Sequence, residues 1–252
     1  ILLGREVPAA FDKDLVDFCL HEVRQYNLVI KRSSEEYLTS KIKDQIDFEK
    51  LTKTIFASSS SITNRLNMYD FESNPHIVTA STPFQASVYQ KFQKASHCLE
   101  IYARDNNVRV APFKGRLITN INMFPIFDFV PHVLLENAIK YSPPDQTVEV
   151  SFEDYSNSFE VKIESLGPAL ARDELTKIFN KGFRGRNASI VSANGGGYGL
   201  YFAKLISELH NLQLSASMND SFIELNNIAY AKFSVTISYS KSNNKTLQRT
   251  GG

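Results

Sequence analysis

The spacing of the apolar residues changes near Asn107, and this change most restricts the folds open to the chain. Before it, apolar residues recur every three or four positions, as in helices; after it, they alternate in short runs, as in strands with one buried face. A hydrophobic fraction of 42% in 252 residues is enough for two cores. The sequence therefore predicts an α+β protein, with a helical domain over residues 1–106, an α/β domain over residues 107–243 and a polar tail over residues 244–252.

The first domain contains three segments with helical spacing, residues 12–39, 48–69 and 84–102. Residues 72–83 hold two prolines and several small polar residues, which predicts a loop. We expect an all-helical domain with at least one antiparallel hairpin. Its apolar faces are long for a single pair of helices, which favours a homodimer. Burial of these faces against the second domain is the alternative.

The second domain mixes helices with strands that alternate between apolar and polar residues. Helices combined with strand hairpins indicate a two-layer α/β sandwich, in which the helices cover one face of a sheet. Residues 111–125 are predicted to be irregular or strand-like. The other predicted elements are strands at 108–110, 148–152, 159–163, 212–216 and 233–239, and helices at 127–141, 173–180 and 199–209.

Composition limits the partners and the cellular compartment. A net charge of +1 gives no general attraction for nucleic acid or an acidic membrane. Cys19 and Cys98 show no metal-ligand spacing, which indicates a reducing, cytoplasmic setting without a zinc site. No apolar run approaches the ~20 residues of a membrane span, and no signal peptide is visible. Because the chain starts at Ile1, we expect a fragment of a longer chain that is membrane-anchored or linked to a sensor.

A glycine loop leads into the predicted helix at 199–209. Gly195, Gly196, Gly197 and Gly199 allow backbone N–H groups to approach an anion, and the helix N-terminus adds a favourable field. A flexible linker is the alternative, but linkers seldom lead directly into a well-patterned helix. The loop lacks the Gly-Lys-Ser/Thr of a phosphate-binding Walker loop and the preceding strand of a dinucleotide fold.

Other polar residues suit the same kind of ligand. Asn137, Lys140 and Tyr141 lie near the end of one predicted helix, where an amide oxygen can bind magnesium and an ammonium group can meet phosphate oxygens. Arg184 and Arg186 flank a glycine in a turn and can pair with phosphates. Taken alone, the first group is better explained as the polar edge of an amphipathic helix, and the two arginines are more usually surface residues.

Four short segments in order resemble the boxes of histidine-kinase-type ATP-binding domains, the superfamily shared with gyrase and the heat-shock chaperone ATPase. ENAIKYSP resembles the N box, ESLGPAL the G1 box, IFNKGFRG the F box and GGGYGLYFAK the G2 box. The resemblance covers residues 107–240. It implies a Bergerat-type sandwich that binds ATP and Mg²⁺ beneath a lid at about residues 181–197.

Residue by residue, the resemblance implies a metal ligand, phosphate contacts and an adenine pocket. Asn137 would bind the Mg²⁺ ion, and Lys140 and Tyr141 would meet the phosphates and the nucleotide edge. Gly167 would shape the adenine pocket, with Ser165 at the position of the family's adenine-reading aspartate. The other matching positions, in the F box and the glycine loop, are Phe179, Arg184, Arg186, Gly195, Gly197, Gly199 and Leu200.

The chain departs from the family pattern at three positions. Ser165 can still hydrogen-bond adenine, directly or through water, but more weakly than a carboxylate. Ala169 replaces the second glycine of the G1 box. Val133 stands where kinases often have asparagine and hydrolytic relatives have a catalytic glutamate, which argues against an ATP-hydrolysing clamp.

The helical domain contains a possible phosphoacceptor. His21-Glu22-Val23-Arg24-Gln25 resembles the H box of sensor kinases, His-Glu-x-x-(Asn/Thr), although the usual proline beyond it is absent. The resemblance implies that His21 attacks the γ-phosphate, that Glu22 takes or orients the proton, and that Gln25 positions a water for dephosphorylation. An ordinary surface histidine is the alternative, and His97 is the competing acceptor.

Three functions follow from these motifs. The first is a sensor histidine kinase core that phosphorylates its own histidine from ATP and passes the phosphate to an aspartate of a response-regulator receiver domain. The second is a non-catalytic nucleotide-binding sensor or scaffold with a decayed G1 box. The third, an ATPase clamp, is disfavoured by Val133.

Overall fold

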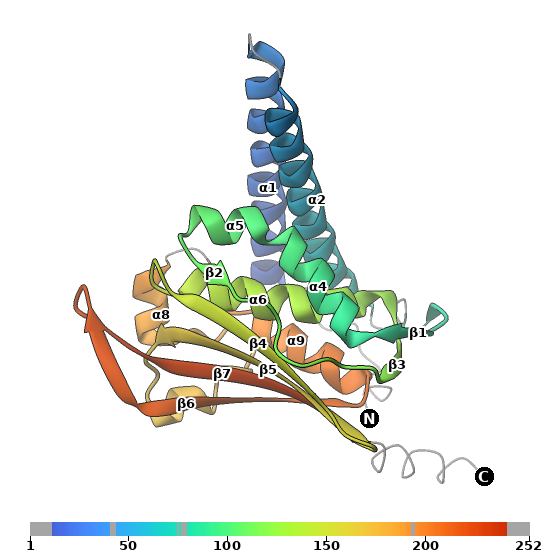
Figure 1. Ribbon diagram of the computed structural model, residues 1–252, viewed down its shortest axis with the longest axis vertical. Helices are drawn as coiled ribbons and strands as arrows, with labels where there is room; N and C mark the ends of the chain where they lie inside the picture. The colour runs from blue at the N-terminus through green and yellow to red at the C-terminus, as the bar shows by residue number, and fades with distance from the viewer. Residues whose placement is uncertain (1–11, 41–43, 75, 77–79, 193–194, 241–252) are drawn as a thin grey trace. The chain divides into compact units, whose positions relative to one another are not determined.

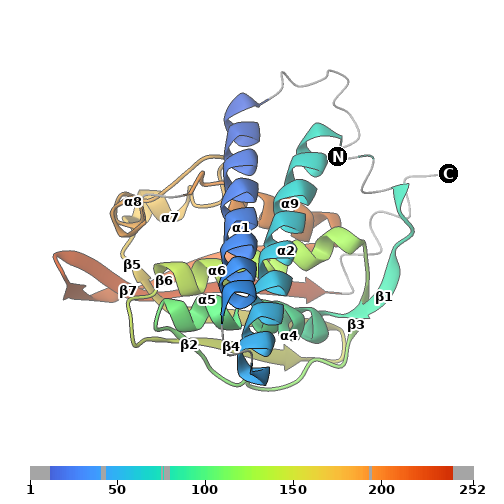
Figure 2. The same cartoon turned by 90° about the horizontal axis from the view of Figure 1, so that it is seen from above.

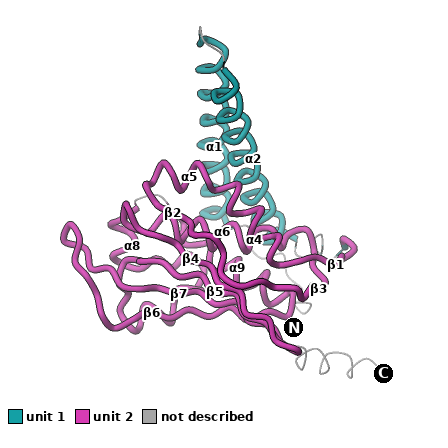
Figure 3. The backbone as a smooth tube through the Cα atoms, in the orientation of Figure 1, with its two compact units in different colours: residues 1–80 teal, residues 81–252 magenta. Residues whose placement is uncertain are grey.

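The computed structural model describes residues 12–40, 44–74, 76, 80–192 and 195–240. The chain divides into two compact units, residues 1–80 (unit 1) and 81–252 (unit 2), shown in different colours in Figure 3. This boundary lies earlier than the expected one at residues 106/107. None of the helices in the described part of the chain has the length and apolar character that a membrane crossing requires.

Unit 1 contains two long helices, α1 (Lys13–Thr39) and α2 (Gln45–Ser73), packed as a hairpin (Figure 1). Each begins at an aspartate whose carboxylate accepts a hydrogen bond from a first-turn N–H. Asp12 accepts from Leu15 at 3.1 Å and Asp44 from Asp47 at 2.7 Å. The expected hairpin is confirmed.

The buried side of α2 is unusually polar. Its buried residues include Thr54, Ser58, Ser61, Asn64 and Arg65. The large apolar residues that the spacing placed on one face are instead exposed, with Phe48 at 56%, Phe56 at 50% and Leu66 at 48%. The contact between α1 and α2 therefore leaves these large apolar side chains exposed.

The third predicted helix belongs to unit 2, not to the hairpin domain. Its start is a strand, β1 (Phe84–Ser87), followed by α4 (Val88–Cys98) and α5 (Glu100–Asp105). Helix α4 packs on α6, and the Phe92 ring lies 5.7 Å from that of Phe152 on the sheet. These contacts anchor the segment in the second core, which explains the shifted boundary.

The sheet of unit 2 has the strand order β2-β4-β5-β7-β6. Only the first pair, β2 with β4, is parallel. A separate antiparallel pair joins β1 to β3 (Asn120–Met123). The bounds of the five strands are Arg109–Val110 for β2, Thr147–Asp154 for β4, Ser158–Pro168 for β5, Leu212–Leu225 for β6 and Ile228–Ser240 for β7.

Strands β6 and β7 are longer than the alternation predicted, because the pairing continues to a turn at Asn226 and Asn227. Both asparagines have positive φ, 51° and 62°, as a two-residue hairpin turn of type I′ requires.

Helices cover one face of this sheet, as Figures 1 and 2 show. The 3₁₀ turn η2 (Pro125–Asp128) leads into α6 (Phe129–Tyr141), which packs on β5 and on α9 (Gly199–Leu209). The expected two-layer sandwich is confirmed. The helix expected at 173–180 is shorter, because α7 (Arg172–Leu175) ends in turns; a further helix, α8 (Arg186–Val191), follows it.

Candidate functional site

The polar residues of α6 are confined to one edge of an otherwise buried helix. Residues 129–136, 138 and 139 are buried, whereas Asn137, Lys140 and Tyr141 are half-buried. The spacing of three and four residues places these side chains along the edge that reaches α9 and the loop before it. The core therefore fixes the helix and leaves this edge available for a ligand.

The glycine loop closes on this edge. A Cβ atom built on Gly195 would lie 3.2 Å from Lys140 Nζ and 3.8 Å from Arg184 Cζ. One built on Gly199 would lie 3.6 Å from Asn137 Nδ2. The structure thus brings together Asn137, Lys140, Arg184 and the two glycines, which are separated by up to 62 positions in the sequence.

Backbone geometry explains two of the glycines. Gly195 and Gly197 have φ values of +144° and +71°, which favour glycine. At Gly197 a Cβ would also lie 2.5 Å from the carbonyl oxygen of Phe183. The loop therefore needs glycine both for its conformation and for its close approach to the segment that carries Arg184.

Two cations meet beside the glycine loop. Arg184 Nη2 donates to the carbonyl oxygens of Ser192 and Ala188, and its guanidinium group also contacts Tyr141. Lys140 Nζ lies 5.6 Å from the centre of the Tyr141 ring. Burial raises the pKa of Tyr141, and Arg184 opposes this only in part, so the phenol stays protonated at neutral pH. The local charge favours an anionic ligand.

Ser165 and Gly167 lie on the helix-facing side of β5. Ser165 is 8% exposed, and a Cβ built on Gly167 would lie 3.4 Å from Phe233 Cβ. Glu164 points to the opposite face, where Lys162 and Lys232 contact its carboxylate at 2.9 and 3.1 Å. Burial works to raise the pKa of Glu164, but the two ammonium groups hold it below its ordinary value. Glu164 therefore cannot supply the carboxylate that position 165 lacks.

Two residues missed by the sequence motifs hold the start of α8. Glu174 accepts hydrogen bonds from the backbone N–H groups of Ala171, at 2.9 Å, and Arg186, at 3.0 Å. Asn187 Nδ2 donates to the carbonyl oxygen of Ala169 at 2.8 Å. A glutamate three residues after a helix start is a capping signal, but it does not predict the second bond, to residue 186.

Three more of the expected site residues make other contacts or are exposed to different degrees. The Arg186 side chain is 86% exposed, with its Nε 3.7 Å from Glu174. Phe179 lies under Lys204, whose Nζ is 5.7 Å from the ring centre. Leu200 is half-buried in the first turn of α9.

The possible phosphoacceptor lies on α1 of unit 1. His21 and Gln25 are exposed, whereas Glu22 is turned toward Arg65 of α2, with 3.4 Å between Oε2 and Nη2. Arg65, which no motif indicated, also lies 5.8 Å from the ring centre of Phe18. Burial raises the pKa of the Cys19 thiol to about 11, so this cysteine is not a nucleophile.

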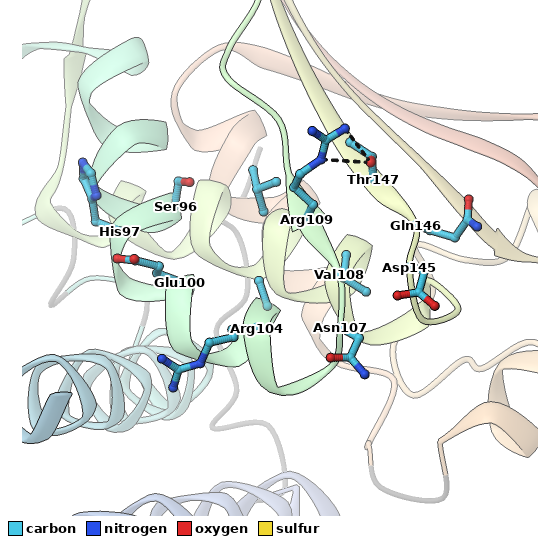
Figure 4. A pocket seen from close by; sticks show the side chains of 12 residues that line it. Ser96, His97, Glu100, Arg104, Asn107, Val108, Arg109, Asp145, Gln146 and Thr147 are labelled. Atoms are coloured by element: carbon cyan, nitrogen blue, oxygen red, sulfur yellow. Dashed lines mark hydrogen bonds between the residues drawn. The ribbon is translucent and has the colours of Figure 1, made fainter. Parts of the chain in front are cut away.

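His97, the competing acceptor, lines a cavity of about 670 Å³ elsewhere in unit 2 (Figure 4). The cavity is formed by α4, α5, β2 and the start of β4. Its lining carries both signs of charge, with Arg104 and Arg109 alongside Glu100 and Asp145. It shares no lining residue with the cluster around Gly195.

Comparison with known sequences points to one family. Residues 131–240 match the family described as histidine kinase-, DNA gyrase B-, and HSP90-like ATPase. The sensor histidine kinase YvrG of Bacillus subtilis (strain 168) is 24% identical over 202 residues, which cover 77% of this chain and 30% of the relative. The probable sensor kinase SilS of Salmonella typhimurium is 31% identical over 78 residues, 31% of this chain and 16% of the relative. The chain therefore spans at most 30% of the length of these two relatives.

Solved structures share the fold. The Acinetobacter baumannii histidine kinase AdeS superposes with a TM-score of 0.51 at 19% identity, covering 88% of this chain and 98% of that one. The catalytic domain of histidine kinase ThkA gives 0.50 at 16% identity, covering 64% and 99%. Residues 131–240 therefore match an ATPase domain of the histidine kinase, gyrase and HSP90 type, and the chain is similar in sequence to sensor histidine kinases and in fold to histidine kinases.

Proposed function

We propose that this chain transfers the γ-phosphate of ATP to His21 and then to an aspartate of a response-regulator receiver domain. The observation that carries the proposal is the convergence of Lys140, Arg184 and Asn137 on the glycine loop before α9. An ATPase domain of this family implies the use of ATP. The transfer of phosphate to His21 and the response-regulator partner are proposals for this chain.

The residues present fit a magnesium-bound phosphate chain. Lys140 and Arg184 supply two positive charges, and the N–H groups of residues 195–199 supply backbone donors. The Asn137 side chain supplies one neutral oxygen, so phosphates and water would complete an octahedral Mg²⁺ shell. The ion would neutralise charge on the phosphates. Asn137 would orient the Mg²⁺ ion, and the glycines leave the space for the phosphates free of side chains.

His21 suits the acceptor role because its ring is exposed on α1. A neutral imidazole nitrogen would form a bond to the γ-phosphorus while the bond to the bridging oxygen breaks and ADP leaves. Glu22 follows His21 directly and lies 3.4 Å from Arg65, so its carboxylate can accept the imidazole proton after a side-chain rotation. In the second step, an aspartate carboxylate of the partner would attack the phosphorus while the N–P bond breaks, and return of the proton from Glu22 to the ring would release neutral His21.

A second copy of the chain is the proposed cover for the apolar surface of unit 1. Many large apolar residues exposed on a pair of helices favour an interaction surface, and two hairpins would bury part of them as a four-helix bundle. The residues of this surface are Leu20, Leu28, Val29, Leu38, Ile46, Phe48, Ile55, Phe56 and Leu66. Dimerisation would thus complete unit 1.

The alternative is a nucleotide-binding sensor or scaffold that does not transfer phosphate. It is favoured by one observation: Ser165 stands where the resemblance implies a carboxylate, and Glu164 faces away from it. Weak base recognition would lower the affinity for ATP without removing the phosphate site.

Incubation with γ-labelled ATP and Mg²⁺ tests the proposal. Acid-labile, base-stable label is expected on the native chain and on His97→Ala, and none on His21→Ala. His97→Ala is a matched control because both histidines are exposed on helices. Label that persists in His21→Ala but disappears in His97→Ala would show that His97, and not His21, is the phosphoacceptor. ATP binding without label on any variant would establish the scaffold.

A further inference from the structure

Helix α8 is a six-residue segment held at both ends by side chains that precede it in the sequence. At its C-terminal end, Arg184 donates to the carbonyl oxygens of Ala188 and Ser192. At its N-terminal end, Glu174 accepts from the N–H of Arg186. No residue of α8 is buried, so apolar packing contributes little to its position.

Both carboxylate oxygens of Glu174 are engaged, one by each of two chain segments. Oε2 accepts from Ala171 N–H at 2.9 Å and Oε1 from Arg186 N–H at 3.0 Å. These two backbone bonds lower the pKa of Glu174, so the side chain is ionised at neutral pH. Charge-assisted bonds of this type are stronger than neutral ones, and two of them fix the distance between residues 171 and 186.

A second set of contacts fastens the same two segments. Asn187 Nδ2 donates to the Ala169 carbonyl at 2.8 Å, and a Cβ built on Gly185 would lie 2.4 Å from Leu170 Cδ2. The start of α8 therefore lies directly against residues 169–171. That turn follows Gly167 at the end of β5, whereas residue 185 follows Arg184. The contacts thus connect the expected base pocket to the cation beside the glycine loop.

We propose that Glu174 is a positioning residue for nucleotide binding: it holds residues 185–187 against residues 169–171 and thereby keeps Arg184 beside Lys140 and Gly195. This inference rests on the proposed binding of ATP. Glu174 does not touch the phosphates; it acts through Arg184, which it holds within reach of them.

Glu174→Gln tests the role with little change of shape. The amide keeps one acceptor oxygen and replaces the other with a donor that faces a backbone N–H. We expect the dissociation constant of a fluorescent ATP analogue to rise about tenfold, the value of one charge-assisted hydrogen bond. Asp173→Asn is the matched control: Asp173 is the neighbouring acidic residue of α7, exposed and paired with Lys177 at 3.1 Å, and its change should leave the constant unaltered.

If Glu174 positions Arg184, its substitution should change the KM for ATP but not the rate at saturating ATP. At saturating ATP, the rate of autophosphorylation of Glu174→Gln should approach that of the native chain, whereas the KM for ATP should rise with the dissociation constant. Asn187→Ala, which removes the second tie, should shift KM in the same direction by a smaller factor. A fall in melting temperature with an unchanged dissociation constant would reduce Glu174 to a structural residue and overturn the inference.

Amide hydrogen exchange separates this inference from the proposed function. Without nucleotide, the Arg186 amide should exchange faster in Glu174→Gln than in the native chain or in Asp173→Asn. An Arg186 amide that stays equally protected would overturn the tie, even if ATP binds as proposed. A native chain that binds no ATP would overturn the proposed function, and the role of Glu174 in nucleotide binding with it.

Discussion

The two units of the chain place their apolar residues in opposite ways. Unit 2 encloses its large aromatic side chains: Phe92, Phe127, Phe129, Phe159 and Phe202 are fully buried. Unit 1 buries threonine, serine, asparagine and arginine on α2 and exposes phenylalanine and leucine. Unit 2 therefore has a closed aromatic core in one copy of the chain, whereas unit 1 leaves many of its large apolar side chains exposed.

The largest expected effect is on the closed core. Phe202→Ala removes a fully buried ring from α9 and should lower the free energy of unfolding of unit 2 by about 3–5 kcal/mol. Phe48→Ala, at an exposed position of α2, should cost less than about 1 kcal/mol in dilute solution. Urea unfolding followed by near-UV circular dichroism measures both. Equal losses of unfolding free energy in Phe202→Ala and Phe48→Ala would contradict the difference between the two units.

The second effect concerns the exposed surface of unit 1. Phe56→Glu would place an unpaired charge in the proposed dimer interface and should raise the dimer dissociation constant on the order of 100-fold. Lys53→Glu, at an exposed position that already carries a charge, is the control. Sedimentation equilibrium gives the constants. A native chain that is monomeric at all concentrations would contradict the proposed dimer.

The smallest expected effect is a pH dependence confined to unit 2. His210 is buried at the end of α9, with Nε2 accepting from Phe124 N–H at 3.0 Å and Nδ1 bonded to the Ile206 carbonyl. Burial lowers its pKa below the ordinary value of about 6.5. The folded state therefore favours neutral His210. Its contribution is complete above pH ~6.5 and is lost as the pH falls through the lower folded-state pKa.

Calorimetry of unit 2 at pH 7.5 and 5.5 checks this contribution. The native chain and the exposed-histidine control, His97→Gln, should lose a few degrees of melting temperature between the two values. His210→Phe should melt lower at pH 7.5, because two hydrogen bonds are gone, yet lose less on acidification. An unchanged pH dependence in His210→Phe would show that another group is responsible.

Parts of the fold and site were predictable because they depend on local pattern. The helix at Gly199–Leu209 was predicted with its observed bounds, since a glycine loop precedes it and apolar spacing continues to its end. The polar edge of α6 was also predictable from the local sequence, because a helix brings together residues that are three and four positions apart. The strand at Phe84–Ser87 was missed, since its residues continue the helical spacing of α4 and its pairing partner, β3, lies over 30 residues away.

The sequence by itself determined the helical hairpin and the α/β sandwich, because these follow from the periodicity of apolar residues, and the order of the four boxes was recognised through their resemblance to a known family. The tertiary structure alone decided which neighbours share a face and which distant groups meet. It separated Ser165 from Glu164, joined Glu174 to Arg186 and paired Glu22 with Arg65. Such contacts depend on how whole elements pack in space. A hydrogen bond between residues 12 or 43 positions apart adds no periodic pattern to the sequence, so the pattern does not predict it.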